Sequence, residues 1–334
     1  MKIGPLRTLP LRLGLKAASR RNSLNRSRLT ALDRKYSVWA AGASVPQTDA
    51  FLFAQIHPYP GLGHQMSGWI SGLLWARDLG LDYAGGILTQ DRRALFAFSL
   101  RQPPESSVVP KVVRLFSVND ERDSRSLNVL RGQMHRALDQ SRDIPIHFQL
   151  ALDQARWDQT PAADVLRSAV LAGPYGNMLR EIETQNQPYI ALHIRRGDVV
   201  EGSMGGSTGQ SRWVDERWYV DLVHRLQKSP TLKGMEVRAY AQGEPKDFPL
   251  LRRQGVTLRV DGDRDTDFVE LGGARILVAA PSSFSFTAGL VSRGVVVAKA
   301  PWWHRVPDEG RWVNVDSGGD YSNSDLERAL SHER

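Results

Sequence analysis

Short apolar runs alternate with longer stretches of helical spacing along most of this chain. The clearest apolar run, residues 189–194, is long enough for a strand, too short for a helix and preceded by Pro188, which a central strand accepts only at its start. Because side chains alternate across a strand, two faces are expected: Ile190, Leu192 and Ile194 on one, and Ala191, His193 and Arg195 on the other. The pattern predicts a buried strand that leads into a charged loop.

The other elements follow from the same two periodicities. Apolar runs predict strands at residues 50–57, 85–88, 108–113, 237–241, 256–260, 276–280 and 295–298. Helical spacing predicts helices at residues 66–80, 164–173, 175–184, 218–226 and 284–292, with residues 122–142 either helical or loop. The alternation of strand and helix indicates parallel sheets. We place a domain boundary near residue 180.

Composition changes this picture only at the amino terminus. The chain has 334 residues, enough for two domains, no cysteine, and no apolar run near the ~20 residues that a membrane span requires. Of the net charge of +8, residues 1–36 hold ten basic residues and one acidic residue, and the remainder is about neutral. The folded body therefore has no basic field for nucleic acid.

Residues 1–49 read as a basic arm with three open interpretations. It could be a flexible arm, a segment that contacts anionic lipid through residues 1–36, or an organelle transit peptide. The first two are favoured over the third. The segment lacks the continuous apolar centre of a secretory signal.

Two arginines, Arg195 and Arg196, stand at the carboxyl end of the central strand, followed by Gly197 and Asp198. Charges at such a place need partners, because uncompensated burial of charge is costly. In an open α/β sheet this end of the strands is also where ligands bind. The pair therefore indicates an anion site, with structural ion bridges to nearby carboxylates as the alternative.

Two further turns carry groups suited to an anion. Residues 61–65 join the first strand to a helix, and Gly61 and Gly63 there let backbone approach a ligand closely. Ser282 and Ser283 lie between a strand and a helix, so hydroxyls and free helix amides meet at that point. A tight turn in the first case and plain helix caps in the second explain the same residues.

Residues 261–267 carry aspartates at alternate positions. An EF-hand requires glycine at its sixth position and glutamate at its twelfth, where this chain has Thr266 and Gly272. Two interpretations remain from the residues alone: a divalent ion held by two of the aspartates, or a solvated loop whose last aspartate, Asp267, caps a helix beginning at residue 268. Residues 201–210, rich in glycine and serine, predict a pliable loop beside the ligand site.

Together these segments resemble the superfamily of α-1,2-, α-1,6- and protein O-fucosyltransferases. Residues 193–198, His-Ile-Arg-Arg-Gly-Asp, match the His-x-Arg-Arg-x-Asp motif of that family at every fixed position. Residues 61–65 are similar to its amino-terminal glycine loop, and Asp267 precedes Ser282 at a spacing similar to that of its third motif. The resemblance implies an α/β fold of GT-B type, with two facing Rossmann-like domains: residues 50–180 on the acceptor side and residues 181–334 on the nucleotide-sugar side.

The resemblance also implies roles for individual residues. Arg195 and Arg196 would engage the pyrophosphate of the donor, and Arg195 would act in catalysis by stabilising the leaving group. His193 and Asp267 would contact the guanine. The remaining contacts would come from Ser282 and Ser283 at the β-phosphate and, across the cleft, from Gly61, Gly63, His64 and Gln65.

The acceptor side is less defined. Glu201, three residues beyond Asp198, is the candidate catalytic base by proximity, with a solvated loop glutamate as the alternative. Asp198 is expected to orient Arg195 or the loop. His64 stands where the α-1,2 branch carries asparagine, and Gln242 stands near the position where relatives carry aspartates, so the resemblance leaves the acceptor open.

The sequence and the resemblance together predict a cytoplasmic glycosyltransferase. The resemblance implies that it transfers fucose from GDP-fucose to a glycan hydroxyl with inversion, and without a metal ion or other cofactor. The alternatives are a transferase for another nucleotide sugar and a catalytically inactive nucleotide-binding module. Nucleic-acid binding is supported only by the basic arm.

Overall fold

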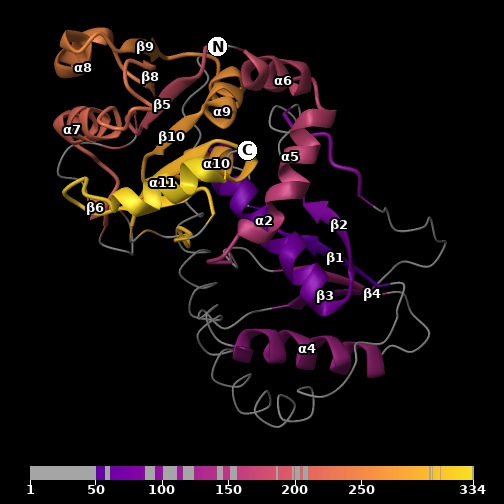
Figure 1. Cartoon of the computed structure of the whole chain (residues 1–334). Helices are drawn as coiled ribbons and strands as arrows, with labels where there is room; N and C mark the ends of the chain where they lie inside the picture. The colour runs from indigo at the N-terminus through magenta and orange to yellow at the C-terminus, as the bar shows by residue number, and fades with distance from the viewer. Residues whose placement is uncertain are drawn as a thin grey trace, which may run out of the picture.

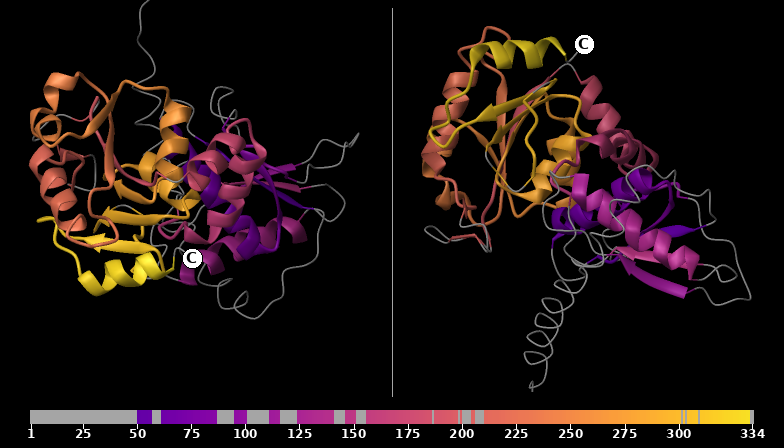
Figure 2. Two further views of the ribbon diagram at one scale, coloured as in Figure 1. Left: turned by 45° about the horizontal axis from the view of Figure 1, so that its top comes forward. Right: turned by 90° about the horizontal axis from the view of Figure 1, so that it is seen from below.

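The computed structural model describes residues 50–56, 61–86, 95–100, 111–115, 124–140, 146–150, 156–185, 187–197, 199, 204–205, 210–300, 302, 304–308 and 310–332. Two parallel β-sheets, each with helices packed on it, form two α/β bodies side by side (Figure 1). Two further views show the same separation, with the indigo-to-magenta half of the chain beside the orange-to-yellow half (Figure 2). The described part of the chain is therefore organised as two α/β halves.

The first sheet and its helices lie between residues 51 and 150. Their bounds are β1 (Phe51–Ala54), α2 (Leu62–Leu79), β2 (Asp82–Gly86), β3 (Lys111–Leu115), α4 (Ser124–Asp139) and β4 (Ile146–Leu150). The strand order is β2-β1-β4-β3, with every neighbouring pair parallel. α2 packs against β1 and β2, and α4 packs against β3 and β4. The helices thus supply the crossovers that parallel strands require.

The second sheet occupies most of the remaining chain. Its strands are β5 (Tyr189–Ile194), β8 (Glu236–Ala241), β9 (Thr257–Val260), β10 (Ile276–Ala279), β11 (Val295–Lys299) and β12 (Trp312–Val315). They lie in the order β9-β8-β5-β10-β11-β12, all parallel. Numbered along the chain, the strands read 3-2-1-4-5-6, the order of the doubly wound Rossmann sheet. The order reverses between β5 and β10, so the segments leaving these two strands diverge and open a crevice.

Helices cover both faces of the second sheet. One face packs α7 (Glu216–Leu226), α8 (Pro249–Arg253) and α11 (Asn323–Ser331) around Ile190, Leu192 and Ile194 of β5. The other face packs α9 (Arg264–Gly273) and α10 (Ser283–Val291) over Ala191. All six residues of β5 are buried. The buried strand and its predicted alternation are therefore confirmed.

The core under α9 and α10 continues into the first half of the molecule. One cluster of buried side chains joins Trp69 and Leu74 of α2 to Phe268 of α9 and Phe286 of α10. α2 packs directly against α10. Burial of apolar area is the main favourable term in such packing, so this interface holds the two halves in one arrangement.

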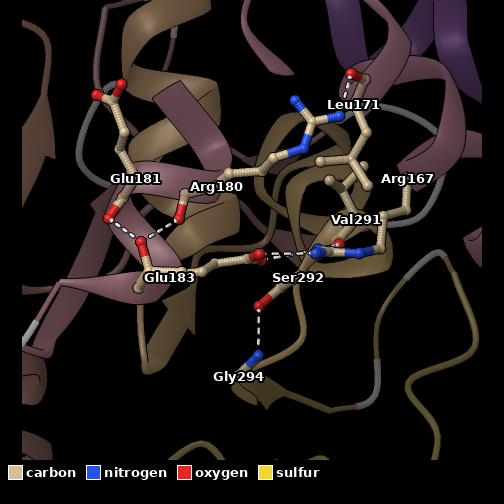
Figure 3. A network of polar contacts seen from close by, with 9 residues as sticks. Arg167, Leu171, Arg180, Glu181, Glu183, Val291, Ser292 and Gly294 are labelled. Atoms are coloured by element: carbon tan, nitrogen blue, oxygen red, sulfur yellow. Dashed lines mark hydrogen bonds and ion pairs between the residues drawn. The ribbon is translucent and has the colours of Figure 1, made fainter. Parts of the chain in front are cut away.

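Two short helices, α5 (Ala163–Ala172) and α6 (Gly176–Thr184), run between the sheets and are tied to α10 (Figure 3). Arg167 of α5 donates to both carboxylate oxygens of Glu183 at 2.8 and 2.7 Å, and to the carbonyl oxygen of Val291 at 3.0 Å. Arg180 donates to the carbonyl oxygen of Leu171 at 3.0 Å. Since Val291 is the last residue of α10, Arg167 places a cation at the carboxyl end of that helix, where the helix dipole favours it.

Most predicted elements are present, and the differences have local causes. The glycine segment was predicted as a turn, but α2 already begins at Leu62. A cap at Asp267 was one of the open interpretations, and it is excluded, because α9 begins at Arg264 with Asp263 as the cap, which accepts from the Thr266 amide at 2.9 Å. Residues 124–139 are helical. β4, α8, β12 and α11 have no counterpart among the predicted elements.

The structure has the predicted GT-B organisation, with two Rossmann-like α/β halves facing each other across a pocket. The first sheet ends at Leu150 and the second begins at Tyr189, so the boundary near residue 180 stays a prediction. None of the described helices is long and apolar enough to cross a membrane. Residues 1–49 lie outside the described part of the chain, and the three interpretations of the basic arm stay open.

Candidate functional site

A pocket of about 410 Å³ lies at the carboxyl ends of the second sheet, where the strand order reverses. Its walls come from the segments that follow β5, β8, β9, β10 and β11, and from the start of α2 in the facing half. In open α/β sheets, ligands bind at this topological switch point. The topology therefore assigns the pocket as the candidate site on grounds independent of any single motif.

Two helix amino termini converge on the pocket. α10 begins at Ser283 with Ser282 as its cap, and the Ser282 hydroxyl accepts from the Phe284 amide at 3.3 Å. α2 approaches from the other half with Gly63 in its first turn: a Cβ there would lie 2.2 Å from the Phe284 amide nitrogen and 2.3 Å from the Ser283 carbonyl carbon. Only glycine permits this backbone contact. The free amides and positive dipole ends of both helices favour an anion in the pocket beside this contact.

The paired arginines line this pocket, and one of them is held rigidly. Arg196 stacks over the Trp213 ring at 3.7 Å and donates to the carbonyl oxygens of Arg195 at 2.9 Å and Val214 at 3.1 Å. These contacts fix its guanidinium against backbone and an aromatic face. Arg195 is partly buried in the wall. The predicted anion site at residues 195–196 thus coincides with the pocket.

Two more arginines complete the cationic wall. Arg212 is exposed at the pocket rim, and Arg264, in the first turn of α9, pairs with the buried carboxylate of Asp265 at 2.7 Å. Neither was predicted from the sequence. Among the described residues, the lining contains four arginines against the carboxylates of Asp261 and Asp267. This excess suits a ligand with more than one negative charge.

His193 is a buried, neutral imidazole in the pocket wall. Burial lowers its pKa to about 3, with the charge of Arg195 as the second cause. The Tyr219 hydroxyl donates to the His193 carbonyl oxygen at 3.2 Å, and the ring lies 5.4 Å from that of Phe284. Within the described residues, Nδ1 of His193 has no hydrogen-bond partner. The backbone of His193 is therefore held, and the ring retains hydrogen-bonding capacity for a ligand.

Asp267 presents a half-buried carboxyl to the pocket. Burial raises its pKa to about 6, and the charges of Glu270 and Asp263 add to the shift. A Cβ at Gly262 would lie 2.6 Å from Asp267 Oδ1, so the backbone of residue 262 passes directly over the carboxyl group, and a side chain there would displace it. Such an acceptor suits a donor-rich ligand edge.

The aspartates of residues 261–267 divide among separate tasks. Asp263 caps α9, Asp265 pairs with Arg264, and Asp261 adopts a left-handed backbone with φ 50° and accepts from the Gly243 amide at 3.3 Å. Across the described residues, no group of three or more His, Asp or Glu side chains could hold a metal ion.

Two aromatic residues after β11 were missed by the sequence analysis. Trp302 lines the pocket, and the buried His304 lies 3.3 Å, through Nε2, from the Ser283 hydroxyl. A signal for them exists in the sequence, because they closely follow the strand at 295–298 and strand carboxyl ends meet at the pocket.

The structure gathers most of the predicted site residues, though not all. Those that line the pocket are Gly61, Gly63, His64, His193, Arg195, Arg196, Asp267, Ser282 and Ser283. Gln65 does not: it lies inside α2, fully buried, because the helix begins earlier than predicted and carries this position away from the opening. Asp198 and Glu201 lie outside the described residues, so their roles stay predictions.

Comparison with known proteins adds weak similarities of fold. No protein-family model matches the sequence, and no curated protein matches it. Among solved structures, POFUT1 in complex with GDP is 10% identical with a TM-score of 0.47, covering 83% of this chain and 100% of that chain. POFUT1 in complex with GDP-fucose is 9% identical with a TM-score of 0.43, covering 75% and 96%. The glycosyl transferase family 9 protein from Veillonella parvula DSM 2008 is 8% identical with a TM-score of 0.45, covering 87% and 99%.

Proposed function

We propose that this protein is an inverting glycosyltransferase that transfers fucose from GDP-fucose to a glycan hydroxyl without a metal ion. The observation that supports this most is the pocket at the Rossmann switch point, where Arg195 and the start of α10 meet the start of α2 from the facing half. A nucleoside diphosphate matches the anion-binding groups of this pocket.

The proposed reaction is a single displacement. The acceptor hydroxyl gives its proton to a base, for which Glu201 is the candidate, and its oxygen forms a bond to the anomeric carbon. The bond from that carbon to the diphosphate breaks, and the electron pair leaves with GDP, so the configuration inverts. Charge builds on the departing diphosphate, where the Arg195 guanidinium and the α10 amides can receive it, a task that other enzymes give to Mg²⁺.

The strand order suggests how the donor lies. Asp267 follows β9 and His193 is the residue before the end of β5, so both stand on one side of the switch point. A carboxylate there can accept from both N–H donors on the guanine edge. Trp302 follows β11 on the opposite side of the switch point, and His64 comes from α2. The transferred sugar would lie beside these two rings, with the diphosphate between sugar and base.

Ligand titration tests this assignment. GDP and GDP-fucose are expected to bind and raise the thermal midpoint, whereas UDP and ADP are not, and fucose transfer is expected to continue in EDTA. Stabilisation by UDP but not GDP would refute the donor, and loss of transfer in EDTA would refute metal independence. Binding of GDP without donor hydrolysis or transfer would indicate an inactive nucleotide-binding module.

The Arg195→Gln variant tests the catalytic part. Removing one fixed charge that stabilises a leaving group costs on the order of 3 kcal/mol of barrier, about a hundredfold in rate. Arg253→Gln, on the exposed end of α8, is the matched control and is expected to leave turnover unchanged. Equal turnover of the two variants at saturating donor would remove Arg195 from the mechanism.

A further inference from the structure

His304 occupies a buried position behind the anion-binding end of the pocket. Only 1% of its surface is exposed. Its ring stacks on Phe286, with centroids 4.6 Å apart and planes 15° apart, and meets Trp302 edge-on at 5.2 Å. Contacts on the face and the edge fix the plane of the imidazole. Packing alone would not require a ring nitrogen to lie within hydrogen-bond distance of a residue that lines the pocket.

One ring nitrogen of His304, Nε2, contacts a residue that lines the pocket. Nε2 lies 3.3 Å from the hydroxyl of Ser283, which is the first residue of α10 and lines the pocket. Either group could be the donor, since a serine hydroxyl has one hydrogen and two lone pairs. Burial lowers the pKa of His304 to about 3, with His64 as a second cause. The ring is therefore neutral at physiological pH and carries a single N–H.

The two possible arrangements differ in what Ser283 offers a ligand. If Ser283 donated to Nε2, its hydroxyl would present lone pairs to the pocket and repel an anion. If Nε2–H donates to the hydroxyl oxygen, the hydroxyl hydrogen is released toward the pocket. The second arrangement agrees with the sign of the surrounding groups, namely the α10 amides and Arg195.

We infer that His304 is a positioning residue that donates from Nε2 to the Ser283 hydroxyl and so directs that hydroxyl as a hydrogen-bond donor to the diphosphate of the nucleotide. The nature of the anion rests on the proposed function, whereas the direction of the hydrogen bond does not. Ser283 is the group that touches the ligand, and His304 acts through it.

The tautomer is tested on the full chain without ligand. Nitrogen-15 NMR of the histidine side chains, with His304 assigned by substitution, is expected to show Nε2 protonated and Nδ1 unprotonated near neutral pH. Ser283→Ala is expected to shift the Nε2 resonance. Protonation at Nδ1 would overturn the inference whether or not any nucleotide binds, so its failure is separate from failure of the donor assignment.

A double-mutant cycle tests the effect on binding, with GDP as the probe. His304→Met keeps the volume but removes the N–H, and is expected to weaken GDP binding about three- to tenfold, the range for one neutral hydrogen bond. In a Ser283→Ala background the same change is expected to have no further effect. His304→Gln, whose amide can donate from a similar position, is expected to restore affinity to within about twofold.

A purely structural role gives a different result. It predicts that His304→Met lowers GDP affinity equally with and without Ser283, and that Gln gives no rescue. Either outcome would overturn the inference. Thermal midpoints of all variants are measured in parallel, and if His304→Met fails to fold, the Gln variant and the NMR tautomer decide.

Discussion

Replacing Gly63 with alanine tests the contact on which both the domain packing and the pocket depend. A Cβ at this position would lie 2.2, 2.3 and 2.6 Å from three backbone atoms of Ser283 and Phe284. Ordinary contacts between carbon atoms lie at about 3.5–4.0 Å, so α2 and α10 would have to separate by more than about 1 Å. Because the new methyl group would clash with backbone atoms at the start of α10, no side-chain rotation relieves the clash.

The magnitude follows from two opposing effects. Overpacking of this kind costs about 1–3 kcal/mol, occasionally more. Within a helix, alanine in place of glycine contributes about 0.5–1 kcal/mol of stability when there is space. Gly68, on the same helix, has such space, because its Cβ would meet nothing closer than Ile56 Cγ1 at 3.8 Å. Gly63→Ala is expected to destabilise the fold and Gly68→Ala to stabilise it. Because the helical preference for alanine applies at both positions, it cancels in the comparison, and the two free energies of unfolding are expected to differ by about 1–3 kcal/mol.

Denaturant unfolding and GDP titration of the two variants provide the assay. Gly63→Ala is expected to weaken GDP binding as well, since it moves two helix starts that face the pocket. Gly68→Ala is expected to leave binding unchanged. If Gly63→Ala proved as stable as Gly68→Ala, or bound GDP as the parent chain does, the proposed contact between the helix starts would be wrong.

Two further substitutions separate the ends of the donor site. The pKa of Asp267 is raised from 3.8 to about 6 in the folded state, so the folded state loses stability as the pH rises through this range. Asp267→Asn removes this loss and is expected to raise the thermal midpoint at pH 7.5. The gain should shrink as pH falls through that window, and GDP binding should weaken at pH 7.5; a midpoint gain independent of pH would contradict the assignment. Trp302→Leu is expected to change the affinity for GDP by no more than about twofold, while GDP-fucose no longer binds more tightly than GDP. If calorimetry finds that the affinity falls equally for both ligands, the sugar does not lie beside Trp302.

The parts of this molecule that could be predicted from sequence are those set by local pattern. β5 was found with both its bounds because an apolar run of strand length ends abruptly at Arg195. Ser282 and Ser283 were found because they sit between a strand and a helix. Gly61 and Gly63 were predicted as a turn that lets backbone approach a ligand. What Gly63 provides in the structure is the close approach of a neighbouring helix, which no local pattern contains.

The parts that could not be predicted depend on how distant segments meet. Arg264 and Trp302 follow strand ends that the sequence shows, but which strand ends meet at one pocket depends on the order 3-2-1-4-5-6, which the sequence does not show. Gln65 was placed at the site because a helix start was misjudged by a few residues, enough to turn a side chain from the opening into the core. Four alternating aspartates could each cap α9, and the choice of Asp263 depends on the end of β9.

Positively charged groups lie at both ends of α10. Its amino terminus faces that of α2 at backbone contact beside Arg195, so in the absence of a ligand the pocket concentrates positive potential. At its carboxyl end, Arg167 donates to the Val291 carbonyl oxygen, and Arg311 donates to the Gly289 carbonyl oxygen at 2.8 Å. Burial and the nearby Arg167 lower the pKa of Arg311 to about 10. These hydrogen bonds oppose a shift of the helix along its axis that would relieve the repulsion. The apolar core shared by both halves holds the charges in place, and an anion that enters finds them already oriented, which is the condition under which fixed charges lower a barrier most.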